Sequence, residues 1–406
     1  MKSIIFFLLT VFFFSCSQES KEFTVSFGGE NFDEGYDIDL NSKGEIILTG
    51  IFTKNLIYKD DTILTSNGGH DIYIIKLSNN GDFIWAKNLG NKKHDWGYNS
   101  VLDEFDNIYT CGSIKIKKKD YPILSKFTNT GEKVFELTLA SVGEFINLSI
   151  INQQILVTGS FKDKKNPIFY KLNSANKLIP ITKLRGQGRG LIKNSENNIV
   201  LYGTRNGDAI LVVLDEKFKT INELQFGTKN KDIVLNCIES DNNYHLVGQS
   251  NGDSLLINDS TISLKSLGGQ DGFYAIIDKQ LRLKNFQLQT SPKSDWSMNL
   301  TKYNKGLIMS SIVSCNGTIN QKVIPDQKGN YDIVLSEIIK GDIKHLKVLS
   351  SPLEEGINKI LIIDNMVYLT GWHQGKLNLN NQLSIKDNKS GSAFVFKVKK
   401  INLFKD

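Results

Sequence analysis

Cysteine, proline and long apolar segments are all scarce in this sequence. Its 406 residues include four cysteines and six prolines, against 33 glycines. Cys111, Cys237 and Cys315 are widely spaced, with no CxxC pair and no histidine at metal-ligand spacing, so we expect mostly buried free thiols rather than a disulfide framework or a zinc site. The glycines and aromatic residues (23 Phe, 13 Tyr and 4 Trp) favour a turn-rich β protein over a helical or collagen-like one.

One apolar run, residues 4–14, is well short of the roughly 20 residues that a spanning helix needs. Lys2 precedes it and Ser15-Cys16 follows it, an arrangement that resembles the lipobox of bacterial lipoprotein signals. We therefore expect a lipoprotein signal peptide at residues 1–15, lipidation of Cys16, a lipidated tether at residues 16–21 and a single domain at residues 22–406. The alternative is a plain secretory signal in which Cys16 is incidental.

Neither a strong net charge nor a catalytic motif is present. Without residues 1–15, which hold one lysine, 48 of the 49 basic residues remain against 43 acidic ones. This balance is too mild to predict nucleic-acid binding. No nucleophile elbow, HExxH motif, P-loop or dinucleotide fingerprint occurs, so we expect no enzyme, cofactor or metal site. Calcium-like segments at residues 39–45 and 103–107 lack the full ligand set and are expected to be hairpin turns.

A short phrase of apolar residues followed by a small pair recurs along the chain and marks a strand. Its seven copies end at Gly50, Gly112, Gly159, Gly203, Gly248, Ser311 and Gly371. The mean spacing, (371−50)/6 or about 54 residues, suits a four-stranded propeller blade that carries insertions. A second, β-branched and aromatic strand follows each copy, at residues 71–77, 122–127, 167–172, 208–214, 272–277, 332–336 and 393–398.

The two ends of the chain complement each other. The last unit stops after its third strand, whereas residues 22–28 match the outer-strand phrase of the other units. We therefore predict an all-β fold, a seven-bladed β-propeller of four-stranded antiparallel blades, with the ring closed by the N-terminal strand. Residues 400–406 are the alternative fourth strand of the last blade.

The first unit also carries a family resemblance. Residues 67–73, 81–90, Asp95 and residues 106–112, with a second match at residues 268–274, resemble the bacterial seven-bladed β-propeller repeat family of secreted and surface proteins. The resemblance covers about residues 22–400 and implies a fold more than an activity. With the lipobox and the Lys, Asn and Ile richness, the chain is similar to a Bacteroidota lipoprotein, which implies anchoring at the outer membrane on its periplasmic or cell-surface side.

The connections between the second and third strands differ in length. They span about 22 to 25 residues in units one, five, six and seven, but about 7 to 11 in units two, three and four. Residues 56–58 with 62–64, and 377–379 with 383–385, predict added hairpins that raise a wall on one side of the face. The low side carries an anion-binding candidate, the lysines Lys117, Lys118, Lys119, Lys164 and Lys165, with Lys115, Lys162 and Arg205 beside them. The alternative is a set of solvated loops in a lysine-rich chain.

Two Asp-Trp pairs, Asp95-Trp96 and Asp295-Trp296, precede inner strands on this same face. Aromatic faces beside carboxylates suit sugar or peptide recognition. The alternative is structural, with the Asp capping a turn and the ring packing between blades.

These features predict a non-enzymatic, lipid-anchored scaffold that presents its uneven face to another envelope protein. A surface glycan-binding lipoprotein that uses Trp96, Trp296 and the lysine loops is the alternative. A propeller-type hydrolase or lyase is the third hypothesis, and it requires the carboxylates of Asp33, Asp95, Asp232 and Asp295 to converge at the channel mouth.

Overall fold

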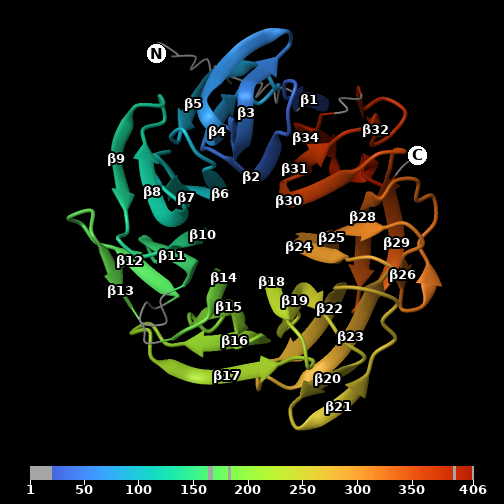
Figure 1. Cartoon of the computed structure of the whole chain (residues 1–406). Coiled ribbons are helices and arrows are strands. Elements are labelled where there is room, and N and C mark those ends of the chain that lie inside the picture. The colour runs from blue at the N-terminus through green and yellow to red at the C-terminus, as the bar shows by residue number, and fades with distance from the viewer. Residues whose placement is uncertain (1–20, 163–167, 182–183, 387–389, 405–406) are drawn as a thin grey trace, which may run out of the picture.

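The computed structural model describes residues 21–162, 168–181, 184–386 and 390–404. There the chain forms a ring of seven blades around a central channel, each blade a set of four antiparallel strands (Figure 1). This confirms the predicted all-β, seven-bladed propeller. Among the described residues the one helical segment is the short 3-10 turn η1 (Lys400–Asn402), and none is a helix long and apolar enough to cross a bilayer.

The first four blades contain the following strands, each blade being given from the channel outward. Blade 1 has β2 (Glu34–Leu40), β3 (Ile46–Tyr58), β4 (Asp61–Leu77) and β5 (Phe83–Leu89). Blade 2 has β6 (Trp96–Leu102), β7 (Ile108–Ile116), β8 (Lys119–Phe127) and β9 (Lys133–Thr138). Blade 3 has β10 (Gly143–Ile151), β11 (Gln154–Phe161), β12 (Phe169–Leu172) and β13 (Leu178–Pro180). Blade 4 has β14 (Gln187–Lys193), β15 (Ile199–Arg205), β16 (Asp208–Leu214) and β17 (Thr220–Phe226).

The last three blades carry inserted hairpins between their second and third strands. Blade 5 has β18 (Ile233–Ser240), β19 (Asn243–Ser250), β22 (Asp271–Asp278) and β23 (Leu283–Thr290), with the hairpin β20 (Ser254–Ile257) and β21 (Ser260–Ser263). Blade 6 has β24 (Trp296–Tyr303), β25 (Gly306–Ser314), β28 (Tyr331–Ile339) and β29 (Asp342–Leu349), with β26 (Thr318–Ile319) and β27 (Lys322–Val323). Blade 7 has β30 (Glu355–Ile363), β31 (Met366–His373), β34 (Ser392–Lys399) and β1 (Phe23–Phe27), with β32 (Leu377–Asn378) and β33 (Ser384–Ile385).

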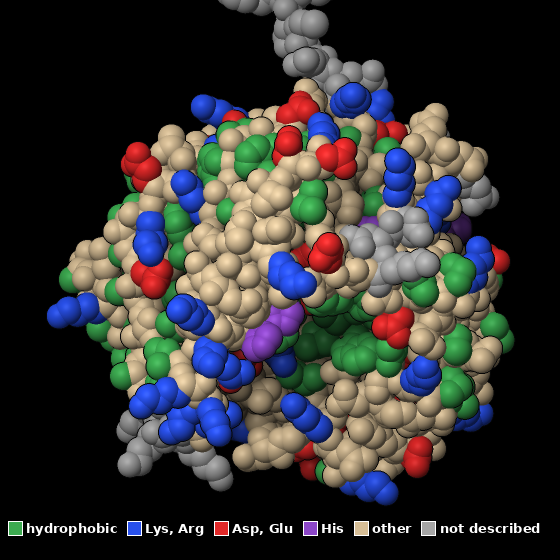
Figure 2. Space-filling view, turned by 45° about the horizontal axis from the view of Figure 1, so that its top comes forward, with side chains coloured by type: hydrophobic (Ala, Val, Ile, Leu, Met, Phe, Trp, Pro, Cys, Tyr) green, Lys and Arg blue, Asp and Glu red, His purple; other side chains and the backbone are tan. Residues whose placement is uncertain are grey.

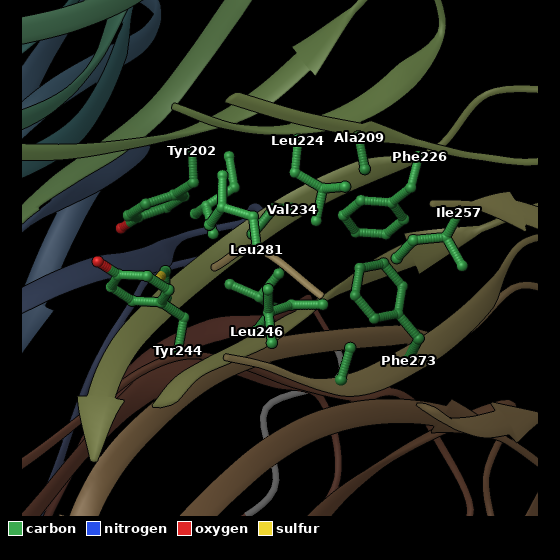
Figure 3. Packing of buried hydrophobic residues seen from close by; sticks show 14 of the residues in the cluster. Tyr202, Ala209, Leu224, Phe226, Val234, Tyr244, Leu246, Ile257, Phe273 and Leu281 are labelled. Carbon is green, nitrogen blue, oxygen red and sulfur yellow. The ribbon is translucent and has the colours of Figure 1, made fainter. Parts of the chain in front are cut away.

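The hydrophobic core lies between blades. The second and third strands are buried on both faces and therefore read as apolar runs, which is why they recur so visibly in the sequence. Figure 3 shows one such layer, where Leu224 and Phe226 of blade 4 point toward Leu246 and Phe273 of blade 5. The Phe226 and Phe273 rings meet edge to face with centroids 6.0 Å apart.

The ring is closed by β1, which pairs antiparallel with β34 from Phe23–Lys397 to Phe27–Ala393. Phe27 is fully buried and stacks on Tyr58, with ring centroids 5.3 Å apart. The closure predicted from residues 22–28 is thus confirmed. The alternative, a fourth strand at residues 400–406, is wrong, because β1 takes that place beside β34 and the chain turns into η1 at Lys400–Asn402.

The two faces of the ring differ in their connections. The turn face carries the tight turns after the first and third strands of each blade, such as Asn41–Glu45 and Ser78–Asp82. The loop face carries the other connections, and there the backbone N–H of Asp95 donates to His70 O (2.7 Å). The calcium-like segments are turns as predicted: the N–H groups of Phe105 and Asn107 donate to the Asp103 carboxylate.

The long excursions do not raise a wall on the loop face, contrary to our expectation. They fold back over the outside of the ring and fill the wedge between neighbouring blades. In the first unit, β3 and β4 extend over β1, where the Gly28 N–H donates to Ile57 O (3.2 Å) and Lys59 reaches Asp82 on the turn face (3.5 Å). In blade 7, Leu377, Leu383 and Ile385 are buried with side chains of blade 6. Radial blades diverge outward, so an apolar hairpin gains burial in the wedge that it lacks on an open face.

Candidate functional site

Every innermost strand carries a β-bulge at the same position. The pairing register shifts there by one residue, and the extra residue is half-buried whereas the residue before it is buried. Because the innermost strand is the channel edge of its blade, the bulge turns this side chain toward the channel. The bulged residues, which we call the bulge ring, are Tyr36, Tyr98, Ile146, Arg189, Leu235, Met298 and Asn358.

A belt of polar side chains follows the bulge ring on the side of the turn face. Asp37 accepts hydrogen bonds from Asn99 Nδ2 (2.7 Å) and from the Ser100 N–H (2.9 Å), and it pairs with Lys359 (3.0 Å). Asn99 Oδ1 in turn accepts the N–H of Leu148 in blade 3 (2.8 Å). These side chains satisfy backbone groups at the free inner edges of the strands. A cavity of about 220 Å³ lies at this end of the channel.

On the side of the loop face, a buried acid stands at the start of the inner strand of five blades: directly before the strand in four of them and as its first residue in blade 7. Asp95 accepts the N–H groups of Asn91 (2.6 Å) and Lys115 (2.7 Å). Asp295 accepts the Ser314 N–H (2.9 Å) and the Ser291 hydroxyl (2.8 Å). Each carboxyl therefore joins two loops of its own blade. The five acids are Asp33, Asp95, Asp232, Asp295 and Glu355, all at most 1% exposed.

Four of these acids lie beside a second acid from the third strand of a blade. Gly90 passes between Asp71 and Asp95, where an added Cβ would lie 2.4 Å from Asp71 Oδ1 and 2.7 Å from Asp95 Oδ2. Burial raises the pKa of Asp71 to about 6, and the neighbouring Asp95 adds to the effect. Burial likewise raises the pKa of Asp295 to about 7. The acids that the hydrolase hypothesis needed free at the channel mouth are thus held by the loops of their own blades.

Trp96 belongs to a row of rings that descends from the loop face into the channel. The exposed ring of His94 lies 4.8 Å from His70, and His70 stacks on Trp96 at 5.3 Å. Trp96 is nearly parallel to Tyr98 (6.5 Å, 10°), which meets Tyr36 edge to face at 5.5 Å. Figure 2 shows a hollow at the centre of one face, lined by hydrophobic side chains, with histidine at its rim.

Trp296 occupies the equivalent strand position in blade 6 but has different neighbours. It is half-buried, meets Tyr331 edge to face at 5.5 Å and packs against the apolar layer between blades 6 and 7. Trp96 and Trp296 therefore do not share one aromatic surface. Trp96 is the better placed of the two for a ligand in the channel.

The lysine candidates are only partly brought together. Lys117, Lys118 and Lys119 are exposed at the tight turn between β7 and β8. Lys115 pairs with Asp120 (3.4 Å), and Arg205 pairs with Glu223, so neither is a free charge of the patch. Lys164 and Lys165 lie outside the described residues.

Sequence reasoning missed two channel carboxylates and one arginine. Asn358 Nδ2 donates to Glu34 Oε1 (2.7 Å), and burial raises the pKa of Glu34 to about 7. The Tyr98 hydroxyl donates to Glu144 Oε2 (2.8 Å). Arg189 is a member of the bulge ring. The fixed distance of each bulge from the preceding acid or glycine would have located these residues, once the inner strands were aligned.

The remaining cysteines are free in the structure: Cys111 and Cys237 are buried as expected, and Cys315 is half-buried. Within the part of the chain that the structure describes, no group of three or more His, Cys, Asp or Glu side chains could hold a metal ion.

No protein-family model and no curated protein matches this sequence. Among solved structures, the chain is similar to the WD40 domain of Neurospora crassa Pan2, at 12% identity and a TM-score of 0.51 over 92% of this chain and 91% of that one. A protein from Lactobacillus plantarum matches at 11% identity and a TM-score of 0.50, over 86% and 98%. A member of the DUF4221 family from Bacteroides vulgatus matches at 10% identity and a TM-score of 0.42, over 93% and 96%. At these identities the first two matches show the fold, a WD40-like β-propeller, and nothing of the activity.

Proposed function

We propose that this protein is a non-enzymatic, lipid-anchored scaffold of the cell envelope that binds another envelope protein on the outer side of blades 4 to 6. The observation that carries the proposal is the pair of grooves on either side of the β20–β21 hairpin. One groove of about 550 Å³ lies between the hairpin and β17, and another of about 190 Å³ lies between the hairpin and β23.

Exposed apolar side chains gather on the same surface. Leu256 on β20 is 59% exposed, Leu267 after β21 is 56% exposed and Val323 on β27 is 74% exposed. Lys265 Nζ joins the two hairpins by donating to Gln321 Oε1 (2.9 Å). Single exposed apolar residues are ordinary, but a group of them beside grooves is typical of a protein-binding surface. The grooves carry charges of both signs, Lys229 and Lys265 beside Asp208, Glu223 and Asp259. The matching partner surface is therefore apolar at its centre, with polar groups of both signs at its rim.

The lipid of this proposal is attached to Cys16, which lies outside the described residues. The position of β1 indicates which face such an anchor would hold toward the membrane. Phe23, the first residue of β1, lies against Gly81, and Lys397 Nζ, on the strand paired with β1, donates to Asn79 O (2.6 Å). Gly81 and Asn79 belong to the Ser78–Asp82 turn, so β1 begins on the turn face. A lipid at Cys16 would therefore hold the turn face toward the membrane and leave the outer side of blades 4 to 6 accessible.

The test is photo-crosslinking in cells with p-benzoylphenylalanine at Leu256 or Val323, followed by mass spectrometry of the crosslinked proteins. Val134, an apolar residue on the outer strand of blade 2 that is 52% exposed, is the matched control position. We expect one envelope protein to be enriched at Leu256 and Val323, not at Val134, and to be lost with Cys16→Ser. Equal recovery at all three positions, or no enriched protein, would contradict the scaffold.

A second candidate, a glycan-binding lipoprotein, is favoured by the placement of Trp96. Its ring stands in the row that leads from the loop face into the channel, as a sugar platform must. Loss of polysaccharide binding in Trp96→Ala, with retention in Trp296→Ala, is the expected result in an immobilised-polysaccharide assay.

A further inference from the structure

One arginine of the bulge ring makes no hydrogen bond within the described part of the chain. The chain has four arginines, Arg185, Arg189, Arg205 and Arg282. Arg205 pairs with Glu223, and Arg282 donates to Asp278 (2.9 Å). Arg189 has no hydrogen bond, ion pair or cation–π contact with any described residue, and its Nε is buried. Burial lowers the pKa of its guanidinium.

A buried guanidinium Nε–H without an acceptor is costly, because it loses hydration and gains no hydrogen bond in return. The planar guanidinium of Arg189 can bind a carboxylate, which accepts two parallel hydrogen bonds from an arginine. The channel position matters here, because the bulge turns Arg189 toward the channel. Figure 2 shows that the centre of one face of the molecule is hollowed. Arg189 therefore marks the anion-binding point of a site.

The neighbours of Arg189 indicate what else the ligand carries. Glu144 of blade 3 and Tyr98 of blade 2 are close enough to act on its charge, and these two are hydrogen-bonded to each other (2.8 Å). The second oxygen of Glu144, Oε1, has no partner among the described residues and can accept a ligand hydroxyl. Next along β6, the half-buried ring of Trp96 stacks on His70 and lies parallel to Tyr98. A carboxylate, a hydroxyl and a flat apolar face within one ring describe an acidic sugar.

We propose that the loop-face end of the channel binds a uronic acid unit of an acidic polysaccharide, with its carboxylate on Arg189, its ring on Trp96 and a hydroxyl on Glu144. This inference deepens the second candidate function and rests on Trp96 as the sugar platform. It specifies that the ligand is negatively charged and that Arg189 binds the charged group. It is independent of the protein-binding surface on blades 4 to 6.

The experiment is isothermal titration of the full mature chain with trisaccharides of galacturonate, guluronate and glucuronate, and with the neutral galactose trisaccharide. We expect at least one acidic trisaccharide to bind the wild type more tightly than the neutral one. Arg189→Gln should weaken this binding about tenfold or more and so reduce the preference for the acidic trisaccharide over the neutral one. Arg189→Lys, which keeps the charge but not the fork, should recover part of it. Arg205→Gln, in the same blade but paired on its outer side, is the matched control and should bind as the wild type does.

The outcomes separate the inference from the function on which it rests. If Trp96→Ala removes binding while both Arg189 variants bind as the wild type does, the glycan function stands and the role of Arg189 is overturned. If none of the four trisaccharides binds the wild type, both are overturned. If a peptide with a free C-terminal carboxylate binds instead, and Arg189→Gln removes that binding, the sugar class is overturned. Urea unfolding of each variant shows that it is folded, and Arg189→Lys decides the case if Arg189→Gln is not.

Discussion

In five blades the inner strand carries two notable side chains, a buried acid at its start and a bulged residue three positions later. The residue type is nearly constant at the first position and varied at the second, for a physical reason. The acid at the start of the inner strand must accept hydrogen bonds from two loops, so its type hardly changes among the five blades that have it. The bulged residue three positions later holds no loop of its blade in place, although Tyr98 and Asn358 each donate to a glutamate of a neighbouring blade. It is tyrosine in blades 1 and 2, arginine in blade 4 and methionine in blade 6. A position that the fold leaves free is one where recognition can arise.

The buried acids also make a testable link between pH and stability. Burial raises the pKa of Asp295 to about 7, from an ordinary value of 3.8. The folded protein therefore binds this proton more tightly than the unfolded chain, and the stabilisation is lost as the pH rises from about 4 through about 7. Asp295→Asn keeps an acceptor oxygen for Ser291 and Ser314 but removes the charge. We expect the variant to be about 2–4 kcal/mol more stable than the wild type at pH 8 and equal to it near pH 4.

Urea unfolding at the two pH values measures this difference. The lowered pKa values of His70 and His245, both caused first by burial, act in the opposite direction, but they are common to both proteins and cancel in the comparison. A gap of the same size at pH 4 and pH 8 would show that folding does not raise the pKa of the Asp295 carboxyl.

At the scale of elements, burial decided which strands the sequence reveals. Second strands such as β3 and third strands such as β4 are buried on both faces, and their apolar runs located all seven blades. Each inner strand is interrupted by its bulge. The alternation of buried and exposed residues along the strand therefore breaks at the bulged residue that faces the channel. Trp96 follows a buried acid and is therefore recognisable in the sequence, whereas Arg189 lies between glycines and is not. The inserted hairpins themselves were predicted. Whether they rise from the loop face or fold back over the outside of the ring depends on the space between neighbouring blades, which no local sequence pattern shows.

Closure by β1 makes Phe27 a sensitive position. Its side chain is fully buried between blades 7 and 1 and stacks on Tyr58 from the extension of β3. Phe27→Ala should lower the free energy of unfolding by about 3–5 kcal/mol, because it leaves a cavity in the layer that joins the two ends of the ring. Thr24→Ser on the same strand is the control and should change it by less than about 0.5 kcal/mol. Urea unfolding monitors both; a change below about 1 kcal/mol in Phe27→Ala would mean that β1 does not hold the ring closed.

For the whole molecule, the decisive geometry is that the chain enters the ring on the turn face. From Cys16 to Glu22 an extended chain spans only about 20 Å, so a lipid on Cys16 would keep the turn face close to the bilayer. The proposed partner surface runs along the outer side, and the proposed sugar site opens on the loop face. Anchoring, protein binding and sugar binding would then use three separate surfaces and need not compete.

This orientation predicts a difference between two surface lysines in the anchored protein. Lys43 is exposed in a turn of the turn face, and Lys118 is exposed on the loop face. A fluorophore on Lys43→Cys should be quenched by nitroxide headgroup lipids in vesicles that carry the lipidated protein, whereas one on Lys118→Cys should not, because quenching falls off within a few ångströms of contact. Cys315→Ser in both proteins removes the half-buried thiol as a background site. Cys16→Ser should abolish the difference, because it releases the protein from the vesicles. Stronger quenching at position 118 than at position 43 would contradict this orientation and would mean that the channel mouth faces the membrane.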